Sequence, residues 1–410
     1  MRTTVISGVL CCLALGFGTG WASEESLLDD EHVTETVVEK ILDAGQVACR
    51  YVSVATTDTD QDADEDILLV DALGNVRLML NNRTKGFSKP VSIAGPVNAV
   101  PGPVSLDLSD VDLDNHEDIL ISSSMGEVYL VSAEGGGRYR PKQKISDALN
   151  KESGLVQVRV SDVDLDNDED IVLATPEGAL YKIENVGTGH FGNASLMVQL
   201  PNVKSGLFDF VFTDLDFDND EEIVFIDGIG TVFVLENLGG RFGEPRHIAG
   251  PFRKDKPGSV DIEVSDYDYD GDDDLIIMGP AGMIVLLENE GKGVFASRPQ
   301  QIAPPLGPEG GIHIMALSDP DTLTGEDIVV VNTKGSIFLI ENRGDGVYDK
   351  PQSIAENIKL APGPASVVRE DMNGDGAEDT LILDGEGHLY LVLGVYDPAE
   401  DLERDLEDDL

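Results

Sequence analysis

The stretch SDVDLDNDEDIV, residues 161–172, decides the fold of this chain. Its aspartates alternate with Val163 and Leu165, and an Ile-Val pair typical of β-strands follows at once. A solvated run of charges has no such alternation and does not lead directly into a strand. The stretch therefore indicates a structured acidic loop that ends in a β-strand.

The same stretch recurs along the chain at a nearly constant spacing. The related segments read TDTDQDADEDIL, SDVDLDNHEDIL, SDVDLDNDEDIV, TDLDFDNDEEIV, SDYDYDGDDDLI, SDPDTLTGEDIV and EDMNGDGAEDTL. Their first aspartates are 52 or 53 residues apart and are Asp58, Asp110, Asp162, Asp214, Asp266, Asp319 and Asp371. A fixed period of this length is the sequence signature of a repeat architecture.

Each repeat contains short β-type runs bounded by Gly, Pro, Asn and Asp. About four strands in a unit of about 50 residues is typical of a propeller blade. A solenoid is the alternative, but its repeats are usually shorter and its ends need capping units that this sequence does not show. We therefore predict an all-β fold, a seven-bladed β-propeller of four-stranded blades.

Closure of the ring requires a strand from the other end of the chain. After the seventh acidic segment only TLILDG and GHLYLVLGVYD remain as strand-like segments, where the other repeats supply three. The segment TETVVEKI, residues 34–41, precedes the first acidic segment and is strand-like. We predict that it completes the last blade, because a closed ring leaves no sheet edge exposed.

The ends of the chain differ in composition from the repeats. Arg2, an apolar stretch from Val5 to Phe17 and the small-residue segment before Ala22 are typical of a secretory signal peptide, residues 1–22. An uncleaved anchor is the alternative, and no other segment is long and apolar enough to span a membrane. We expect a secreted protein (extracellular, periplasmic or cell-surface), with an extension at 23–33, the propeller at 34–396 and an acidic tail at 397–410.

The formal net charge of −50, from 78 acidic and 28 basic residues, excludes partners that carry a dense negative charge. Such a surface repels nucleic acid and anionic lipid. Cations, basic surfaces and neutral ligands remain, although adaptation to a salt-rich habitat would also explain the acidity. Two of the three cysteines lie in the predicted signal, so Cys49 alone is left and no internal disulfide is expected.

The acidic segments have the side chains that calcium requires. Ca²⁺ takes six to eight oxygen ligands, mainly carboxylates and carbonyls. In the third segment Asp162, Asp164, Asp166 and Asp170 occupy positions 1, 3, 5 and 9, and Asp168 at position 7 can offer its carbonyl. Position 12 is apolar and a strand is expected from position 10, so the loop is no EF-hand. An acidic hairpin without an ion is the alternative for any single loop.

The turn at position 6 supports a tightly wrapped loop. Gly and Asn tolerate left-handed backbone angles better than other residues. The residues found there are Asn115, Asn167, Asn219, Gly271 and Gly376, and the first loop departs from this pattern with Ala63.

These repeats resemble the FG-GAP or VCBS type found in the calcium-bearing propellers of integrin α-subunits and in many bacterial secreted proteins. The segments ENVGTGHF, ENLGGRF, ENEGKGVF and ENRGDGVY are similar to the Asn-x-Gly-x-Gly-x-aromatic segment of that family. The resemblance covers about residues 34–396. It implies that each acidic loop joins the first and second strands of a blade and that calcium stiffens the ring. It does not imply one particular ligand.

The resemblance also assigns candidate metal ligands, one loop at a time, and about six calcium sites. They are Asp58, Asp60, Asp62 and Asp66; Asp110, Asp112, Asp114 and Asp118; Asp162, Asp164, Asp166 and Asp170; Asp214, Asp216, Asp218 and Glu222; Asp266, Asp268, Asp270 and Asp274; and Asp371, Asn373, Asp375 and Asp379. Glu222 is longer than the aspartate of its sister loops. The sixth loop keeps Asp319, Asp321 and Asp327 but has Leu323 at position 5 and Pro320 inside it, so we expect that site to be weak or empty.

The sequence contains no Gly-x-Ser-x-Gly elbow, His-Glu-x-x-His motif or phosphate-binding loop. We therefore expect no enzyme but a monomeric, calcium-binding interaction module for an unidentified protein or glycan. A secreted hydrolase or polysaccharide lyase on the same ring, and a structural or calcium-buffering surface protein, are the alternatives. Arg343-Gly344-Asp345 fills variable turn positions rather than forming an adhesive motif. Arg253, Lys254 and Lys256 either balance the acidic field or form a binding loop.

Overall fold

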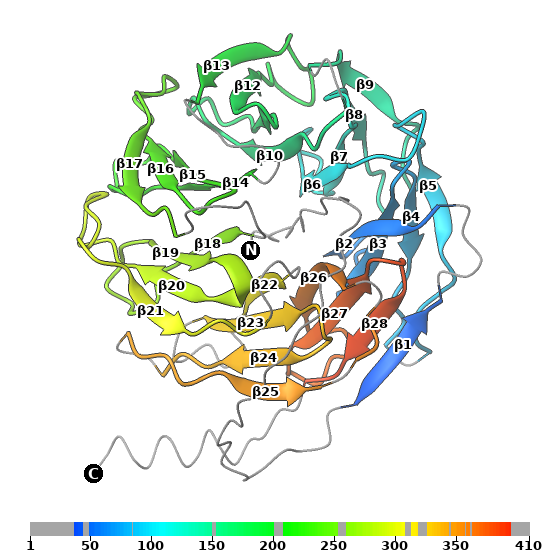
Figure 1. The fold of residues 1–410 in the computed structure, drawn as a ribbon. Helices are drawn as coiled ribbons and strands as arrows, with labels where there is room; N and C mark the ends of the chain where they lie inside the picture. The colour runs from blue at the N-terminus through cyan, green and yellow to red at the C-terminus, as the bar shows by residue number, and fades with distance from the viewer. Residues whose placement is uncertain are drawn as a thin grey trace.

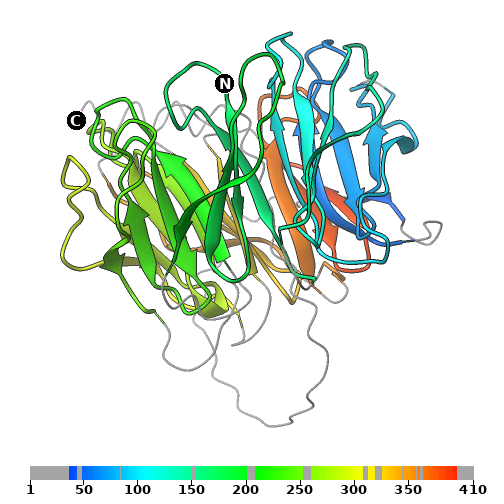
Figure 2. The same ribbon diagram turned by 90° about the horizontal axis from the view of Figure 1, so that it is seen from above.

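The structure is a computed structural model that describes residues 37–43, 49–83, 85–149, 153–200, 208–252, 260–307, 313–318, 326–343, 346–356, 358–360 and 363–394. These residues form seven four-stranded antiparallel sheets arranged as blades in a closed ring (Figure 1). Seen from the side, the strands run steeply between the two faces of the ring (Figure 2). The predicted seven-bladed β-propeller is confirmed.

Strands are given from the centre of the ring outward. The first four blades consist of β2 (Tyr51–Thr57), β3 (Asp66–Asp71), β4 (Val76–Met79) and β5 (Val91–Ala94); β6 (Ser105–Ser109), β7 (Asp118–Ser122), β8 (Val128–Val131) and β9 (Gln143–Ser146); β10 (Gln157–Ser161), β11 (Asp170–Ala174), β12 (Ala179–Ile183) and β13 (Ser195–Gln199); and β14 (Phe208–Thr213), β15 (Glu222–Asp227), β16 (Val232–Leu235) and β17 (Arg246–Ala249).

The other three blades follow the same order. They consist of β18 (Asp261–Ser265), β19 (Asp274–Met278), β20 (Ile284–Leu287) and β21 (Gln300–Ala303); β22 (His313–Ser318), β23 (Asp327–Asn332), β24 (Ile337–Ile340) and β25 (Gln352–Ala355); and β26 (Pro364–Glu370), β27 (Asp379–Asp384), β28 (Leu389–Val392) and β1 (Val38–Leu42). One 3₁₀ turn, η2 (Pro280–Gly282), lies between β19 and β20.

The N-terminal strand closes the ring as predicted. Strand β1 is the outermost strand of the seventh blade and pairs antiparallel with β28, with Val38 opposite Val392 and Lys40 opposite Tyr390. The described part of the predicted segment, residues 37–41, therefore joins the two ends of the chain in one sheet (Figure 1).

The hydrophobic core lies between the blades. The described residues form seven buried apolar clusters, and each cluster draws on two blades that are neighbours in the ring. The cluster at the seam joins Tyr51 and Ile67 of the first blade to Leu381 of the seventh, with Ile41 and Leu42 of β1 packed against it. Every residue of β11 is buried, because the second strand of a blade is covered on both faces. Burial of these faces is what holds the blades together.

Polar side chains satisfy the inner edges of the blades. An inner strand has no neighbouring strand on the side that faces the centre of the ring. Its backbone amides on that side therefore need other hydrogen-bond acceptors. Ser366 Oγ accepts the amide of Val54 at 3.3 Å, and Asp107 Oδ2 accepts the amide of Val160 at 2.8 Å. In both cases the acceptor belongs to the preceding blade. The blades are thus linked by hydrogen bonds at the centre as well as by apolar packing.

Several predicted features lie outside the described residues. They are the signal peptide at 1–22, the extension at 23–33, the basic segment around Lys254, Gly344 and Asp345, the sixth-loop residues 319–323 and the tail at 397–410. Cys49 is a free thiol in the structure. In the ranges that the structure does describe, no helix has the length and apolar character needed to cross a membrane.

Removal of β1 should open the ring. A variant lacking residues 23–43 loses the pairing of β1 with β28 and the packing of Ile41 and Leu42, which together should cost on the order of 2 kcal/mol or more. We expect a lower unfolding temperature and self-association through the bare edge of β28, measured by calorimetry and size-exclusion chromatography. A control variant lacking residues 397–410 should match the full chain. Equal unfolding temperatures for the two truncations would contradict closure by β1.

Candidate metal centre

The acidic loops connect the innermost strand of a blade to the second strand. The third loop, for example, lies between β10 and β11. This position is the one expected from the family resemblance. The second strand begins at position 9 rather than at position 10 as predicted, because Asp170 already pairs with Ser161 in the β-ladder. The position-9 side chain is therefore held by the sheet and not by the loop.

Two left-handed residues wrap each of the six acidic loops whose turns the structure describes. The expected one is at position 6, where Asn167 has φ 70° and even Ala63 has φ 66°. The second is at position 4, where Leu165 has φ 62°, Phe217 60° and Tyr269 58°. The sequence did not predict the left-handed residue at position 4, because bulky side chains rarely adopt positive φ angles. Two such turns within three residues are what bend the chain into a closed cradle.

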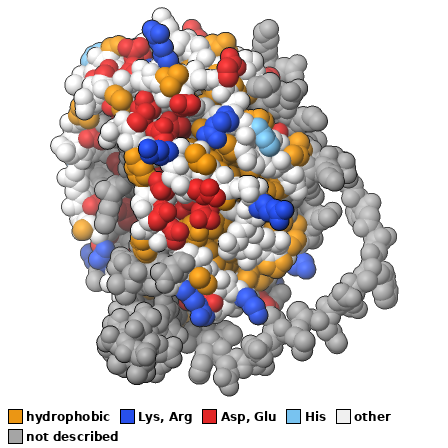
Figure 3. All heavy atoms as spheres, turned by 90° about the vertical axis from the view of Figure 1, so that its left-hand side faces the viewer, with side chains coloured by type: hydrophobic (Ala, Val, Ile, Leu, Met, Phe, Trp, Pro, Cys, Tyr) orange, Lys and Arg blue, Asp and Glu red, His pale blue; other side chains and the backbone are white. Residues whose placement is uncertain are grey.

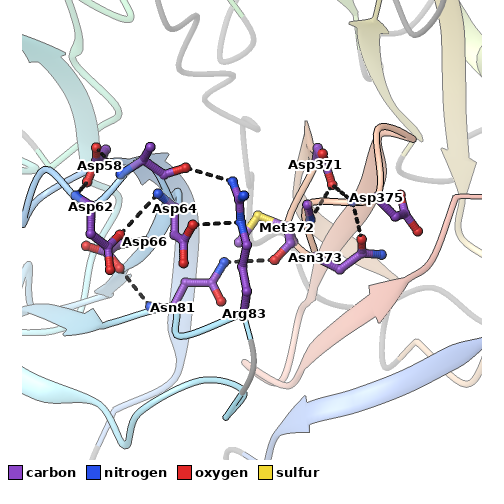
Figure 4. Close-up of polar contacts among 12 residues, drawn as sticks. Asp58, Asp62, Asp64, Asp66, Asn81, Arg83, Asp371, Met372, Asn373 and Asp375 are labelled. Carbon is purple, nitrogen blue, oxygen red and sulfur yellow. Dashed lines mark hydrogen bonds and ion pairs between the residues drawn. The ribbon is translucent and has the colours of Figure 1, made fainter.

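The carboxylates at positions 1 and 5 organise the backbone of the loop. In the third loop Asp162 accepts the amides of Asp166 and Asn167, at 3.0 and 2.9 Å, through its two oxygens. Asp166 in turn accepts the amide of Asp168 at 3.0 Å. Asp58 and Asp371 accept the corresponding amides in the first and seventh loops (Figure 4). These loops are therefore shaped by their own hydrogen bonds.

The carboxylates at position 9 are buried and only half satisfied. Asp118, Asp274 and Asp379 are at most 1% exposed. One oxygen of each accepts a backbone amide, from Ala133 at 2.8 Å in the case of Asp118. The other oxygen, Oδ2, is buried and has no hydrogen-bond partner among the described residues. A buried polar atom without a partner costs free energy, so these oxygens indicate a missing partner.

Carboxylate oxygens of positions 1, 3 and 5 converge in four loops, and those of positions 1, 3 and 9 converge in the loop that begins at Asp266. In five loops three carboxylates place one oxygen each within 4.8 Å of one another: Asp58, Asp60 and Asp62; Asp110, Asp112 and Asp114; Asp162, Asp164 and Asp166; Asp214, Asp216 and Asp218; Asp266, Asp268 and Asp274. Burial raises the pKa of Asp118 to about 7 and that of Asp274 to about 8, and the neighbouring carboxylates add to the rise. A cation at the centre would reverse this effect. The donor set fits a hard cation that prefers oxygen.

The fourth loop departs from this pattern, because Glu222 reaches further than an aspartate. Its Oε2 accepts the amide of Leu215 at 2.9 Å and its Oε1 accepts that of Asn237 at 3.4 Å, so both oxygens are engaged. In the same loop Asp220, at position 7, is 6% exposed, and its Oδ1 has no hydrogen-bond partner in the described part of the chain. The fourth loop therefore offers Asp220 as a further carboxylate that the sequence analysis did not select.

The first and seventh loops show smaller differences. In the first loop the amide of Thr59 donates to Oδ2 of Asp66 at 3.2 Å, and the Thr59 hydroxyl donates to the same oxygen. In the seventh loop Asn373 Oδ1 accepts the amide of Asp375 at 2.8 Å. Of the three candidates in the sixth loop, the structure describes only Asp327.

In five blades an asparagine, which in four of them belongs to the Asn-x-Gly segment, ties the blade to the loop of the preceding blade. The sequence analysis assigned it no role. Its Nδ2 donates to the carbonyl at position 2 of that loop over 2.8–3.0 Å; the pairs are Asn185 with Val111, Asn237 with Val163, Asn289 with Leu215, Asn342 with Tyr267, and Asn81 with Met372. The donors and acceptors lie in different blades, so one acidic loop is held by two blades.

A glycine of the same segment lets the turn cover the neighbouring loop. Gly240 has φ 83°, and a Cβ on it would lie 2.7 Å from the Cβ of Asp164. Gly189 packs in the same way over Asp112, where a Cβ would come within 3.1 Å. Asp112 and Asp164, the position-3 candidates of the second and third loops, are thus each covered by a turn of the next blade.

The seam between the first and seventh blades has an additional link (Figure 4). Arg83 lies between the two loops: its Nε is 2.6 Å from Oδ1 of Asp64, and its Nη2 donates to the carbonyl of Ala63 at 2.7 Å. It also lies against Gly374 of the seventh loop, where a Cβ would come within 2.8 Å of its side chain. Together with Asn81, Arg83 joins the loops at the point where the ring closes.

Apolar side chains project from the acidic loops. Position 2 faces the core, and Val163 is 0% exposed, whereas position 4 faces solvent. Leu113, Leu165, Phe217 and Tyr269 at position 4 are 47–56% exposed. Large exposed side chains held in the left-handed region are a costly arrangement that clusters at functional sites. An apolar residue inside an otherwise polar loop is the sequence signal that could have identified them.

A second charged group lies on the inner strands near the centre of the ring. Arg159 Nη2 is 3.6 Å from Oδ1 of the buried Asp209, and Asp107 and Glu263 are also buried. Burial raises the pKa of Asp107 to about 7 and that of Glu263 to about 8. A single acidic residue within an apolar strand, such as Asp107 in SLDLS, is the sequence signal that could have indicated this group. Since Asp107 accepts the amide of Val160, it is part of the link between blades at the centre.

No known protein family matches the chain by sequence, and no curated protein matches it. Solved structures do match. The BP39L lectin from Burkholderia pseudomallei has a TM-score of 0.65 at 17% identity, over 85% of this chain and 98% of that one. A lectin from Agrocybe aegerita, described for recognition of non-reducing terminal N-acetylglucosamine, has a TM-score of 0.60 at 20% identity, over 76% and 81%. BBS1N in complex with ARL6DN has a TM-score of 0.55 at 10% identity, over 88% of this chain and 96% of that one. Identities this low show the propeller fold alone.

Loss of the link made by Asn185 should destabilise the ring. Asn185→Ala removes the donor to the Val111 carbonyl and leaves that buried acceptor without it, which should cost about 1–3 kcal/mol in chemical denaturation. Asn193→Ala, at an exposed position of the same blade, is the control and should change the free energy of unfolding by less than about 0.5 kcal/mol. Equal effects of the two substitutions would refute the proposed link.

Proposed function

We propose that this protein is a secreted, calcium-stabilised β-propeller that acts as a non-catalytic binding module. The observation that carries the calcium part is the set of buried Oδ2 atoms of Asp118, Asp274 and Asp379, which have no hydrogen-bond partner among the described residues. Each stands at position 9, directly after a preshaped loop, and Asp274 places an oxygen within 4.8 Å of oxygens of Asp266 and Asp268. A cation bound there would supply the missing partner.

The chemistry of the donors favours calcium over other divalent ions. All the candidate ligand atoms are oxygens, whereas structural zinc sites use thiolates and imidazoles. Mg²⁺ requires a near-ideal octahedral shell at 2.0–2.1 Å and keeps several waters, whereas Ca²⁺ accepts six to eight oxygens in variable geometry. Loops of unequal composition, with Glu222 in one and Asn373 in another, suit the more tolerant ion.

An ion in these loops would act on the whole ring. It would join position 9, which is fixed in the second strand, to positions 1, 3 and 5 of the loop. The same loop accepts a hydrogen bond from the asparagine of the next blade. Metal binding would therefore rigidify each loop and the interface beside it. Because binding to the folded state alone adds to stability, several filled sites could contribute as much as the rest of the fold.

The binding role is supported by the architecture and by the exposed loop residues. Two of the similar structures are lectins, which agrees with a protein or glycan partner for this ring. The face that carries the acidic loops presents Leu113, Leu165, Phe217 and Tyr269 to solvent. Acidic and hydrophobic side chains also lie beside one another on the side of the ring that Figure 3 shows. Such mixed surfaces provide apolar contacts within a polar surround.

Calcium should raise the unfolding temperature. With each site filled at about 100 times its dissociation constant, the gain is roughly 2.7 kcal/mol per site, measured by calorimetry in calcium against chelator. Mg²⁺ should restore much less of the stability. Asp118→Asn should reduce the calcium-dependent gain, whereas Asp147→Asn, at a side chain that is 99% exposed, should not. Identical melting curves with calcium and with chelator would reject calcium.

Binding should depend on the loaded ring. On glycan and protein arrays we expect a ligand that is retained with calcium and lost with chelator. Replacing Phe217 and Tyr269 by serine should weaken retention while leaving the calcium-dependent unfolding temperature unchanged, since both side chains are more than half exposed. If neither chelator nor these substitutions changes retention of the ligand, the face that carries the acidic loops has no role in binding. Release of cleaved glycan fragments would favour the hydrolase or lyase alternative.

A further inference from the structure

The third blade carries a lysine where the other six blades carry an aliphatic residue. Lys182 lies in β12 opposite Val172 of β11. The residues at the same register in the other blades are Leu78, Leu130, Val234, Leu286, Leu339 and Leu391. Five of these six side chains are at most 5% exposed, and all six belong to the apolar clusters between blades or pack against them. A lysine at such a position must find partners for its charge.

Lys182 finds these partners inside the third acidic loop. Its Nζ lies 2.7 Å from Oδ2 of Asp170, at position 9, and contacts Oδ2 of Asp164, at position 3, at hydrogen-bond distance. The lysine side chain is 13% exposed and that of Asp170 is 0% exposed. The ammonium group therefore lies between two carboxylates of one candidate metal site.

Among the described residues, no lysine or arginine forms an ion pair with the position-9 carboxylate of the first, second, fourth, fifth or seventh loop. In the second loop Leu130 stands in the place of Lys182. The exposed Arg140 lies 3.8 Å from Oδ2 of Asp112, but it forms no ion pair with Asp118. The third loop has a complete aspartate set by sequence, yet its position-9 oxygen is already neutralised by a cation of the same chain. The difference between the loops thus comes from one residue of the third strand.

We propose that Lys182 is a built-in counter-ion that takes the place of calcium in the third loop. This inference rests on the proposed calcium function. Ca²⁺ and the ammonium group require the same oxygens of Asp164 and Asp170, so one excludes the other. The ammonium group is tethered to the chain and its side chain is only 13% exposed, so its removal from the site would expose the aliphatic stem. The third loop is therefore closed without metal, while its neighbours depend on the ion.

Replacement of Lys182 should create a metal site. Lys182→Leu installs the residue type of the other blades and frees the oxygens of Asp164 and Asp170. Native mass spectrometry at saturating calcium should show one more bound ion than in the wild type. In chelator the variant should unfold at a lower temperature than the wild type, because its third loop then has no cation. Lys144→Leu, which removes the same charge from an exposed ion pair with Glu127, should change neither result.

The reciprocal variant covers the case in which Lys182→Leu does not fold. Leu130→Lys places an ammonium group beside Asp112 and Asp118, and it should bind one calcium ion fewer than the wild type. If the wild type binds several calcium ions and both variants bind the same number, the role of Lys182 is overturned while the calcium proposal stands. Absence of bound calcium from the wild type and from Lys182→Leu would overturn both.

Discussion

Repulsion among carboxylates is the constraint on which this structure depends. Five acidic loops bring three carboxylates together, and the carboxylate at position 9 of each is buried in the second strand. The loop backbone satisfies positions 1 and 5, but it leaves oxygens of Asp118, Asp274 and Asp379 without a partner among the described residues. Such a loop is stable only if the charge is neutralised by protons, by a cation or by a side chain. The raised pKa values of these carboxylates express the same cost.

The ring spreads this local constraint over the whole molecule. Seven apolar clusters hold neighbouring blades together, and an asparagine such as Asn185 or Asn237 ties the next blade to the acidic loop. A loop that is poorly neutralised therefore weakens an interface and not only a turn. Lys182 shows the alternative solution, in which one blade neutralises its loop from within. The inner carboxylates around Arg159 are a separate group, linked to the backbone of neighbouring inner strands.

Most of the fold could be predicted from the sequence because a repeat displays its own period. The spacing of Asp58 and its counterparts, the left-handed position of Asn167 and the closing strand near Val38 all depend on residues close together in sequence or on an obvious repeat. The candidate ligands could be named for the same reason. The left-handed backbone of Phe217 could not, since nothing in a side chain of that size indicates it.

The partners of the site could not be predicted, because they come from other strands and other blades. The asparagine that caps the loop of Asp110 is Asn185, in the next blade, and Lys182 reaches its loop from the third strand. The inward turn of Glu222 onto the amide of Leu215 depends on one extra methylene group. These contacts depend on the packing angle between blades, and the spacing of the repeats gives no information about that angle.

A crystal structure of the calcium-loaded protein, with anomalous scattering used to locate the ions, tests the central claim most directly. The account predicts anomalous peaks at the centres of the first, second, fourth, fifth and seventh loops, within about 2.3–2.6 Å of their carboxylate oxygens, and none beside Lys182. Loops without anomalous peaks, with Oδ2 of Asp118 hydrogen-bonded to water alone, would contradict it.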